Sequence, residues 1–504
     1  MPGQKAGTAE ASGLSYGRRM AVLAICCLSL FIVGLDTTVV NVALPAIHRA
    51  LHASVSGLQW TIDAYTLVLA SLLILSGSAA DRLGRRRVFQ VGLVVFALAS
   101  LLCGLAPSLG LLVGARVLQA IGGSMLNPVA MSIIRNVFED PRERARAIGL
   151  WGAVFGLSMA LGPVVGGALV DAVSWRAVFF VNVPIGLLAI LLTARFVPES
   201  RAPEPRRVDP VGQLLVIAAL AGLTYAIIEG PRAGWASAEI VGLFAGAAAC
   251  AAALVAYERR RLEPLLEMRF FASAPFSGAS AIAVLTFASL GGFLFLNTLY
   301  LQDVRGLSPL QAGLSMLPVG GLLLFVSPIS GRIVARRGPR MPLLGGAVAT
   351  IAAAAMLTRL TPYTAWGYLL ASYVLLGVGM GLLNPPITNT AVSGMPGEQA
   401  GVAAAIASAS RQVGMTLGVA AIGAIAGGTI AGSIGRSFAS ATHRGWWVIV
   451  ALGAIILLGG LVSTGRWAER TATRTAERLR SAEGDDGRAE APPPLPLRRA
   501  LQRR

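Results

Sequence analysis

The sequence has few charged residues for its length. Only 13% of its 504 residues are Asp, Glu, Lys or Arg, whereas soluble proteins carry about 25%. Because 55% of the residues are hydrophobic, this shortage excludes a string of soluble domains and predicts an all-α protein that crosses a membrane many times. The net charge of +18 does not indicate nucleic acid as a partner, since the arginines stand in short clusters between apolar runs and not on one arm or face.

Cysteine and histidine are also scarce, with four and three residues. The cysteines lie within apolar runs and have neither disulfide nor metal-ligand spacing, and the histidines are scattered over the predicted outer loops. We therefore expect no metal site. We also expect no cleavable signal peptide, because residues 1–17 are polar and the first apolar run is too long for one.

Short charged loops separate the apolar runs, and the loop Gly77–Arg87 is the most informative. Its sequence, GSAADRLGRRR, places one carboxylate and four arginines between two apolar runs of about 20 residues, the length that crosses a bilayer. Its positive charge is typical of a cytoplasmic loop between two spanning helices. By the same length rule we predict fourteen spans, at residues 20–45, 58–80, 87–106, 110–134, 147–171, 177–197, 210–229, 238–257, 275–301, 308–331, 341–360, 364–390, 401–432 and 445–465.

The distribution of basic residues predicts the orientation. With Gly77–Arg87 inside, 33 of the 42 Lys and Arg lie on the cytoplasmic side, seven on the outer side and two within spans. This asymmetry favours fourteen spans with both termini in the cytoplasm. The tail 466–504 is rich in Arg, Glu and Pro, so we expect it to be disordered. Contact of this tail with anionic lipid headgroups is the alternative.

The two halves of the chain resemble each other. A shift of 254 residues aligns Gly77–Arg87 with a second loop, in which Ala335 stands in place of Asp81. A shift of 257 residues aligns span four with span twelve, so that Val117, Leu118, Gly122, Leu126, Asn127 and Pro128 match Val374, Leu375, Gly379, Leu383, Asn384 and Pro385. This repeat predicts two six-helix bundles around a substrate site near the midplane. The predicted divisions are 1–19 (N-terminal tail), 20–197 (first bundle), 198–274 (two inserted helices), 275–465 (second bundle) and 466–504 (C-terminal tail).

Two charged residues, Asp36 and Arg116, are predicted to lie at similar depths near the middle of the membrane. A charge there costs roughly 2.5–3.5 kcal/mol, so such residues usually serve a function. At 1.5 Å per residue, each lies about 21–24 Å from the inner end of its span, and the two can neutralise each other. As a proton-coupling site, Asp36 would exchange a proton, because burial favours the neutral acid and Arg116 favours the carboxylate. A static ion pair that joins two helices is the alternative.

Other polar residues within spans are candidates for function. Asp63 lies about one turn inside the outer end of span two, where it is either a further proton-coupling residue or a solvated interfacial one. Arg411 has no acidic partner nearby in the second half; it binds Asn or backbone carbonyls, or meets Asp36 or Asp63 across the cavity. The residues assigned to a possible substrate cavity are Asn41, Tyr65, Asn384, Arg411 and Gln412.

Span five, GAVFGLSMALGPVVGG, is rich in glycine. Its small residues are spaced by four at Gly152 and Gly156 and again at Gly162 and Gly166. Small residues at this spacing make a flat helix face that permits close packing. Pro163 removes one backbone hydrogen bond and predicts a bend in the middle of the span. A tightly packed, bent helix beside the cavity would seal or release one side of it.

These motifs resemble those of the major facilitator superfamily, in particular its 14-span drug:proton antiporters. The span-one residues DTTVVNVALP, which begin at Asp36, resemble the first motif of these exporters, and Arg116 with Gly122 and Gly123 resembles the span-four motif implicated in proton coupling. The cytoplasmic-gate signature of the superfamily is matched by Gly77, Asp81, Arg82, Gly84, Arg85 and Arg86. The antiporter motif associated with export is matched by Gly152, Gly156, Gly162, Pro163, Gly166 and Gly167.

The resemblance implies the major facilitator fold and the export of amphipathic, often cationic or aromatic compounds in exchange for protons. Drugs, antiseptics and antibiotics are such compounds, and the proton gradient takes the place of a cofactor. Spans nine to fourteen lack the buried acids that some multidrug members use for dications, which disfavours divalent organic cations. We expect a monomer in the bacterial cytoplasmic membrane that binds a small molecule and protons.

The resemblance also suggests a cycle of alternating access. Asp36, held by Arg116 in the inward-facing state, would take up a proton in the outward-facing state and release the substrate. Asp81 with its neighbouring arginines would latch the inner gate by facing a helix N-terminus of the other half. One proton that moves down about 100 mV supplies about 2.3 kcal/mol, which supports a roughly 40-fold gradient of a neutral substrate.

Two other functions stay open. A facilitator or symporter that imports a small polar metabolite would share this fold, although the motif of span five disfavours it. A membrane enzyme belongs to a different class, and the sequence shows no embedded nucleophile–base pair, metal cluster or phosphate-binding loop.

Overall fold

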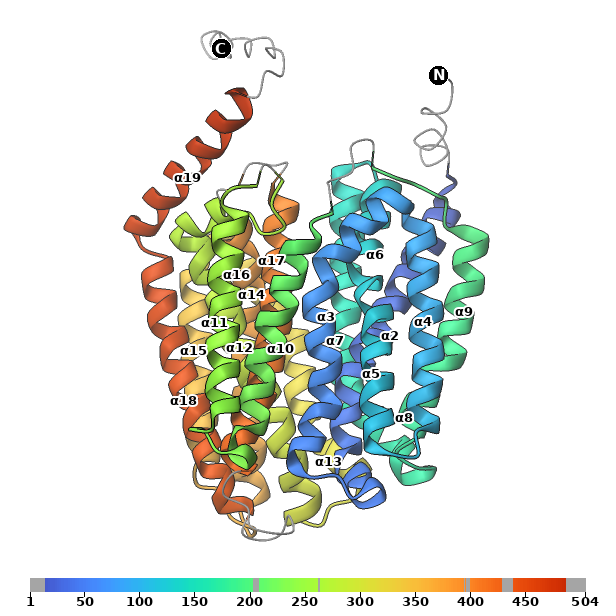
Figure 1. Cartoon of the computed structure of the whole chain (residues 1–504), viewed down its shortest axis with the longest axis vertical. Coiled ribbons are helices and arrows are strands. Elements are labelled where there is room, and N and C mark those ends of the chain that lie inside the picture. The colour runs from blue at the N-terminus through green and yellow to red at the C-terminus, as the bar shows by residue number, and fades with distance from the viewer. Residues whose placement is uncertain are drawn as a thin grey trace, which may run out of the picture.

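The computed structural model describes residues 14–202, 208–261, 263–393, 395, 399–427 and 438–485. These residues form helices and no strands (Figure 1). The helices up to residue 196 are α2 (Tyr16–Leu51), α3 (Val55–Leu83), α4 (Arg85–Leu105), α5 (Leu109–Ser124), α6 (Leu126–Val137), α7 (Pro141–Ala172), α8 (Ala177–Phe180) and α9 (Asn182–Phe196). The later ones are α10 (Pro210–Ala233), α11 (Ala238–Glu258), η1 (Met268–Ala272), α12 (Ala274–Leu299), η2 (Tyr300–Val304), α13 (Pro309–Ser315), α14 (Leu317–Arg337), α15 (Arg340–Leu357), α16 (Trp366–Val392), α17 (Ala400–Gly427), α18 (Phe438–Ser463) and α19 (Arg466–Asp485).

Local sequence signals set many of the helix ends. Side chains of Ser54, Ser108 and Asp140 accept hydrogen bonds from the free backbone N–H groups at the starts of α3, α5 and α7. Gly84 ends α3 with φ of +113°, and Gly338 ends α14 with φ of +80°. Glycine adopts these conformations without steric cost, so each residue turns the chain into the next helix.

The prediction of fourteen spans agrees with the described helices. Thirteen helical segments are long and apolar enough to cross a membrane. The fourteenth is α17, whose 28 residues extend about 42 Å but whose apolar character is lowered by Arg411 and Gln412. Its predicted range of 401–432 runs beyond Gly427 into residues 428–437, which lie outside the described part of the chain.

Three of the spans are broken into two helices, which the sequence analysis did not predict. The breaks fall between α5 and α6, between α8 and α9, and between α13 and α14. Each break precedes a proline in the first turn of the second helix: Pro128, Pro184 or Pro318. Proline fits there because its missing N–H would have no partner in a first turn.

The helices form two bundles that repeat the same neighbours. In the N bundle (α2–α9), α2 packs on α7 and α4 packs on α5. In the C bundle (α12–α18), α12 packs on α17 and α15 packs on α16 in the same way. Figure 1 shows the N bundle, in blue to green, beside the C bundle, in yellow to orange. The fold is therefore the predicted pair of six-span bundles with two inserted helices.

The two ends of this assembly differ in charge. The start of α2 and the end of α18 lie at one end of the molecule (Figure 1). We call this end the basic face, because it also carries the arginines of Gly77–Arg87 and of residues 259–261 and 332–340. We call the other end, at which α2 ends and α3 begins, the opposite face.

The two bundles contact each other through the part of the molecule nearer the opposite face. There Gln59 of α3 donates hydrogen bonds of 3.0 and 2.8 Å to the backbone oxygens of Val419 and Ala420 in α17. Asp171, at the end of α7, accepts hydrogen bonds from the Ser308 hydroxyl (2.7 Å) and from the backbone N–H of the second residue of α13 (2.9 Å). These contacts close the seam between the bundles at the opposite face.

The inserted helices α10 and α11 lie along this seam and do not form a separate unit. α10 packs against both α3 and α17, whereas α11 packs mainly on α10. The indole of Trp60 in α3 donates a 3.0 Å hydrogen bond to Glu229 in α10, and Gln213 of α10 donates one of 2.6 Å to the backbone oxygen of Ser71. The insertion therefore covers one side of the junction between the two bundles.

The expectation that the whole tail 466–504 is disordered is wrong for its first part. Residues Arg466–Asp485 form α19, which packs on α12 and η1. Ala468, Thr475 and Leu479 recur on one helix face and are buried, and the Thr471 hydroxyl accepts a 2.9 Å hydrogen bond from the N–H of Ala274. This narrow stripe of buried residues is hard to recognise in the sequence, because it lies among many Arg and Glu residues. Residues 486–504 lie outside the described part of the chain.

The close packing of α7 on α2 can be tested with two alanine variants. A Cβ at Gly166 would lie 2.9 Å from the backbone oxygen of Val39, whereas a Cβ at Gly152 would meet open space. We expect Gly166→Ala to destabilise the protein by about 1–3 kcal/mol through overpacking. Gly152→Ala should be neutral or stabilising by up to about 1 kcal/mol, because alanine favours helices. Equal shifts of the thermal unfolding midpoint in detergent would contradict this packing.

Candidate functional site

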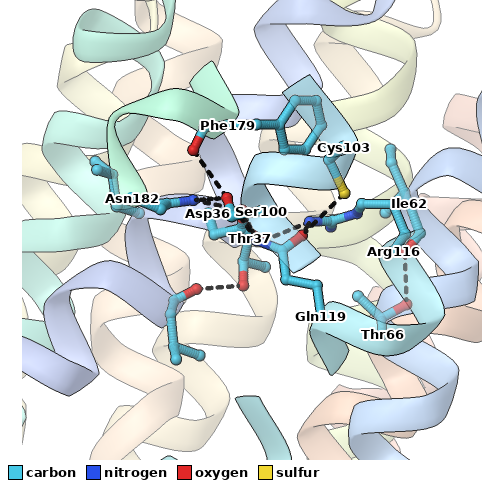
Figure 2. Close-up of polar contacts among 12 residues, drawn as sticks. Asp36, Thr37, Ile62, Thr66, Ser100, Cys103, Arg116, Gln119, Phe179 and Asn182 are labelled. Carbon is cyan, nitrogen blue, oxygen red and sulfur yellow. Dashed lines mark hydrogen bonds and ion pairs between the residues drawn. The ribbon is translucent and has the colours of Figure 1, made fainter. Parts of the chain in front are cut away.

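An enclosed ion pair joins Asp36, in α2, to Arg116, in α5 (Figure 2). Nη1 of Arg116 donates a hydrogen bond of 2.5 Å to Oδ2 of Asp36. The two side chains are 0% and 1% exposed. The ion pair that the matching depths predict is therefore present, and it lies wholly within the N bundle.

Three neutral side chains complete the surroundings of this pair. Gln119 Nε2 and Asn182 Nδ2 donate hydrogen bonds of 2.9 and 3.0 Å to Oδ1 of Asp36. Both amides also donate to the hydroxyl of Ser100, which donates in turn to the backbone oxygen of Phe179 (Figure 2). Both oxygens of the carboxylate are thus satisfied by donors from α5 and α9. The hydrogen bond from the guanidinium is charge-assisted and is therefore stronger than those from the two amides.

Arg116 is held from several sides as well. Its Nη1 also donates a 2.7 Å hydrogen bond to Gln119, and its Nε donates one of 3.2 Å to the backbone oxygen of Thr61 in α3. Its guanidinium carbon lies 4.1 Å from the centre of the Tyr65 ring, a cation–π distance. The network therefore links α2, α3, α4, α5 and α9.

Gln119, Ser100 and Asn182 were not assigned to the site from the sequence. A signal was available for Gln119, because it follows Arg116 by three residues and shares its helix face. Ser100 gives a weaker signal, because it is a small polar residue inside an apolar run. Asn182 reaches Asp36 because the break between α8 and α9 places it at the start of α9.

Asp63 lies at the seam between the bundles and has a different environment. It is 0% exposed, and its only hydrogen bond among the described residues is a long one of 3.4 Å from the Thr66 hydroxyl to Oδ1. Oδ2 has no partner. Its neighbours on the same face of α3, Gln59 and Thr66, both bond to α17 of the C bundle. An unpaired carboxylate is costly in such a place, whereas the neutral acid is tolerated. The expectation of a solvated interfacial residue does not match this burial.

The loop Gly77–Arg87 forms a tight turn between α3 and α4. Asp81 accepts two hydrogen bonds from Arg85, of 3.0 and 2.9 Å, and Gly84 supplies the positive φ. Glu199, which follows α9, accepts a hydrogen bond of 3.1 Å from the N–H of Arg86 and so caps the start of α4. The sequence analysis did not identify Glu199.

The expected contact of Asp81 with a helix N-terminus of the other half is not present among the described residues. Asp81 instead pairs with Arg85 in its own half because the two are four residues apart across the turn. Arg86 donates a 2.7 Å hydrogen bond to the backbone oxygen of Ala194, again in the N bundle. Gly77 lies beside Pro128 of α6, and Arg82 is exposed.

The glycines of α7 allow close contacts with two sets of helices, α2 on one side and α13 and α14 on the other. Gly162 and Gly166 face α2, where Thr38 and Val39 lie against them. Gly156 faces Leu324 of α14, and Gly167 lies against the backbone of Pro309 at the start of α13. The backbone oxygen of Pro163 likewise lies against Gly313 of α13. Gly152 has open space, so it does not act with Gly156 as one packed face. Glycine allows α7 to lie close to both bundles at once.

The residues assigned to a possible cavity do not all come together. Asn41 is buried and donates to the backbone oxygen of Thr37, and Tyr65 packs under Arg116 in the enclosed network. Arg411, in α17, is partly exposed and donates to Thr388 in α16, not to Asp36 or Asp63. Asn384, one turn from Thr388, and Gln412 are also partly exposed.

Comparison with known proteins identifies the family. The sequence matches the family description Major Facilitator Superfamily over residues 26–419. The chain belongs to the major facilitator superfamily. The predicted superfamily and fold are thereby confirmed, and the fold is one of transporters rather than enzymes.

Its relatives within the superfamily include named resistance proteins. Multidrug resistance protein Stp of Mycobacterium tuberculosis is 38% identical over 398 residues, which cover 79% of this chain and 74% of that protein. The tetracenomycin C resistance and export protein of Streptomyces glaucescens is 38% identical over 82% of this chain and 77% of its own. Puromycin resistance protein pur8 of Streptomyces alboniger is 37% identical over 88% of this chain and 90% of its own length.

Solved structures support the fold alone. A bacterial homologue of the human lysosomal transporter spinster, in an inward-facing and unoccupied conformation, aligns with a TM-score of 0.64 and 20% identity over 92% of this chain and 99% of that one. A peptide transporter crystallised with sulfate aligns with a TM-score of 0.67 and 13% identity over 95% of this chain and 99% of that one.

The energetic coupling within the enclosed pair can be measured by a double-mutant cycle. Asp36→Asn leaves Arg116 as an unpaired buried cation, which should destabilise the protein by about 3–5 kcal/mol. The double variant Asp36→Asn/Arg116→Gln should lose less than the sum of the single variants, by at least about 1 kcal/mol. The measurement is the change in stability on unfolding in mixed detergent. The longer pair Arg49–Asp303, at 3.7 Å and with the Arg49 side chain 61% exposed, serves as the control and should couple by at most about 1 kcal/mol. Additive effects at Asp36 and Arg116 would contradict a coupled pair.

Proposed function

We propose that this member of the superfamily exports amphipathic small molecules, such as drugs or antibiotics, across the bacterial cytoplasmic membrane in exchange for protons. The relatives named above, which are resistance and export proteins, support this class of substrate. The observation that carries the proton coupling is the presence of two fully buried carboxylates, Asp36 and Asp63, at membrane depth in one bundle. Acids in that position are costly and usually serve a function.

The orientation follows from the charge on the two faces. The basic face is placed in the cytoplasm, because cytoplasmic loops carry the excess of Lys and Arg. Both termini then lie in the cytoplasm, and the seam closed by Gln59 and Asp171 lies on the outer side. The conformation described here is therefore inward-facing in our proposal.

Asp63 is placed to couple a proton to the closing of the outer side. Its neighbours Gln59 and Thr66 hold α3 against α17 in this conformation, in which the seam is closed. Uptake of a proton from outside would neutralise Asp63 and permit the seam to close. Loss of the proton would favour the outward-open state, in which the carboxylate can be hydrated. This order carries a proton inward on Asp63 in one step of the cycle and exports substrate on the return step.

Asp36 and Arg116 give the second half of the mechanism. In the inward-facing state the carboxylate is held by three donors. Protonation of Asp36 in the outward-facing state would weaken its hold on Arg116 and let the helices of the N bundle shift, which releases the substrate. The turn held by Asp81, Arg85 and Glu199 keeps α3 and α4 together, so that the bundle moves as one body.

Import of a small polar metabolite is the second candidate function. The same fold serves importers, and the peptide transporter noted above is a structural neighbour. The glycines of α7 that contact α13 and α14 belong to the stretch that resembles the export motif, which favours the first proposal. Accumulation of a labelled metabolite in intact cells would favour the second.

The role of Asp36 in coupling can be tested with everted membrane vesicles. When the vesicle interior is acidified, an exported compound should dissipate the pH gradient as it enters in exchange for protons. We expect Asp36→Asn to slow this dissipation at least ten-fold for compounds from a panel that includes puromycin and rhodamine 123. Glu239→Gln, which removes an exposed carboxylate of α11, should behave as the unsubstituted protein does. Dissipation by Asp36→Asn at the unsubstituted rate would refute the assignment.

The role of Asp63 can be tested through the pH dependence of the outer seam. Spin labels at Val173→Cys and Leu314→Cys, both exposed positions beside the junction of α7 and α13, report its width. A rise in pH should widen the seam, because ionised Asp63 disfavours the closed state. Asp63→Asn keeps the group neutral and should hold the seam closed at all pH values. If the seam of the Asp63→Asn variant widens with rising pH as that of the parent does, Asp63 is not the group that controls the width of the seam.

A further inference from the structure

Arg411 is a cation within the membrane part of the C bundle that has no carboxylate partner among the described residues. The whole stretch 275–465 contains only two acidic residues, Asp303 and Glu398. Asp303 lies near the opposite face, 3.7 Å from Arg49, and Glu398 lies outside the described residues. An unpaired guanidinium at membrane depth is costly, so a partner from outside the protein would relieve that cost.

The hydrogen bonds of Arg411 leave most of its donors available. Nη1 and Nη2 donate to the same acceptor, the Thr388 hydroxyl of α16, at 3.1 and 3.2 Å. A guanidinium has five N–H donors in a flat fork that fits a carboxylate or a sulfonate. Its central carbon lies 6.0 Å from the centre of the Phe287 ring in α12, which adds an aromatic surface beside the charge. The amide of Asn384 stands one turn from Thr388 on the same face of α16.

Arg411 also lies where the two bundles begin to separate. The last hydrogen bond between α17 and α3 in the direction of the basic face joins Thr416 to Thr66, at 2.9 Å. Arg411 lies five residues, or about 7.5 Å, beyond Thr416 toward the basic face. Its side chain is partly exposed there, in contrast to Arg116, which is 1% exposed. A molecule that enters from the basic face can reach Arg411 without passing the closed seam.

We infer that Arg411, positioned by Thr388 and flanked by Phe287, binds an acidic group on the exported compound. This inference rests on the proposed export function and names its substrate class: amphipathic aromatic compounds that carry a carboxylate, sulfonate or phenolate. The charge of the other membrane residues agrees with this class. Asp36 and Arg116 neutralise each other, whereas Arg411 has no carboxylate partner among the described residues, so its positive charge favours an anionic group.

The test compares two dyes that share a xanthene ring system, anionic fluorescein and cationic rhodamine 123. Binding to the full-length protein in lipid nanodiscs is measured by fluorescence anisotropy. The parent should bind fluorescein more tightly than rhodamine 123. Arg411→Gln should weaken fluorescein binding at least ten-fold and rhodamine 123 binding less than two-fold, whereas Arg411→Lys should keep part of the affinity. Arg359→Gln, which removes an exposed cation of the same bundle, should change neither.

Other outcomes would overturn the inference. Equal weakening of both dyes by Arg411→Gln would make Arg411 a structural clamp between α16 and α17. A parent protein that prefers rhodamine 123, or that binds neither dye, would exclude an anion site. If Arg411→Gln does not fold, Thr388→Val gives the second variant, since it removes the acceptor that orients the guanidinium and should weaken fluorescein selectively.

The export function is judged separately, in proteoliposomes with a pH gradient. Proton-coupled movement of rhodamine 123 without fluorescein binding would leave export standing and refute the anion site. Selective fluorescein binding through Arg411 without gradient-driven movement of either dye would support the site and refute export.

Discussion

The pairing of a carboxylate with a guanidinium in the hydrocarbon interior sets the structure of the N bundle. Two isolated charges could not remain there, and a buried pair alone roughly breaks even against the loss of hydration. The cost of lost hydration is offset because Asp36 and Arg116 make further hydrogen bonds with two side-chain amides and with the Thr61 backbone oxygen. The hydrogen-bonding groups must therefore all lie at the same depth in the membrane, which fixes how the helices of the bundle pack against one another.

The two buried acids of this bundle have different surroundings. Both carboxylate oxygens of Asp36 accept hydrogen bonds from side chains of its own bundle. Asp63 has an oxygen without a partner, and it lies between groups that bind the other bundle. In the proposed mechanism, a change of charge at Asp63 would act directly on the seam, whereas a change at Asp36 would first disturb the interior of its own bundle. This difference would make Asp63 the more direct link between a proton and the opening of the outer side.

The sequence predicts the spans, the repeat and the main ion pair because each depends on local or periodic signals. Asp36 and Arg116 could be matched from depth alone, since a helix rises by a constant distance per residue. The role of Glu199 could not be predicted, because it caps α4 from a segment more than 100 residues away. The helix α19 was missed for another reason: its buried stripe of Ala468, Thr475 and Leu479 is small and lies among charged residues that dominate the composition.

The internal repeat explains why Arg411 stands alone. Under the shift of 257 residues, Arg116 corresponds to Tyr373, which donates a 2.6 Å hydrogen bond to Asn297 of α12. The C bundle thus keeps the link between its first and fourth spans but makes it without charge, and both side chains are fully buried. Arg411 has no part in that link and lies nearer the basic face. Because the neutral link already joins these helices, their packing does not require a cation, and in our inference the charge of Arg411 acts on a molecule that enters between the bundles.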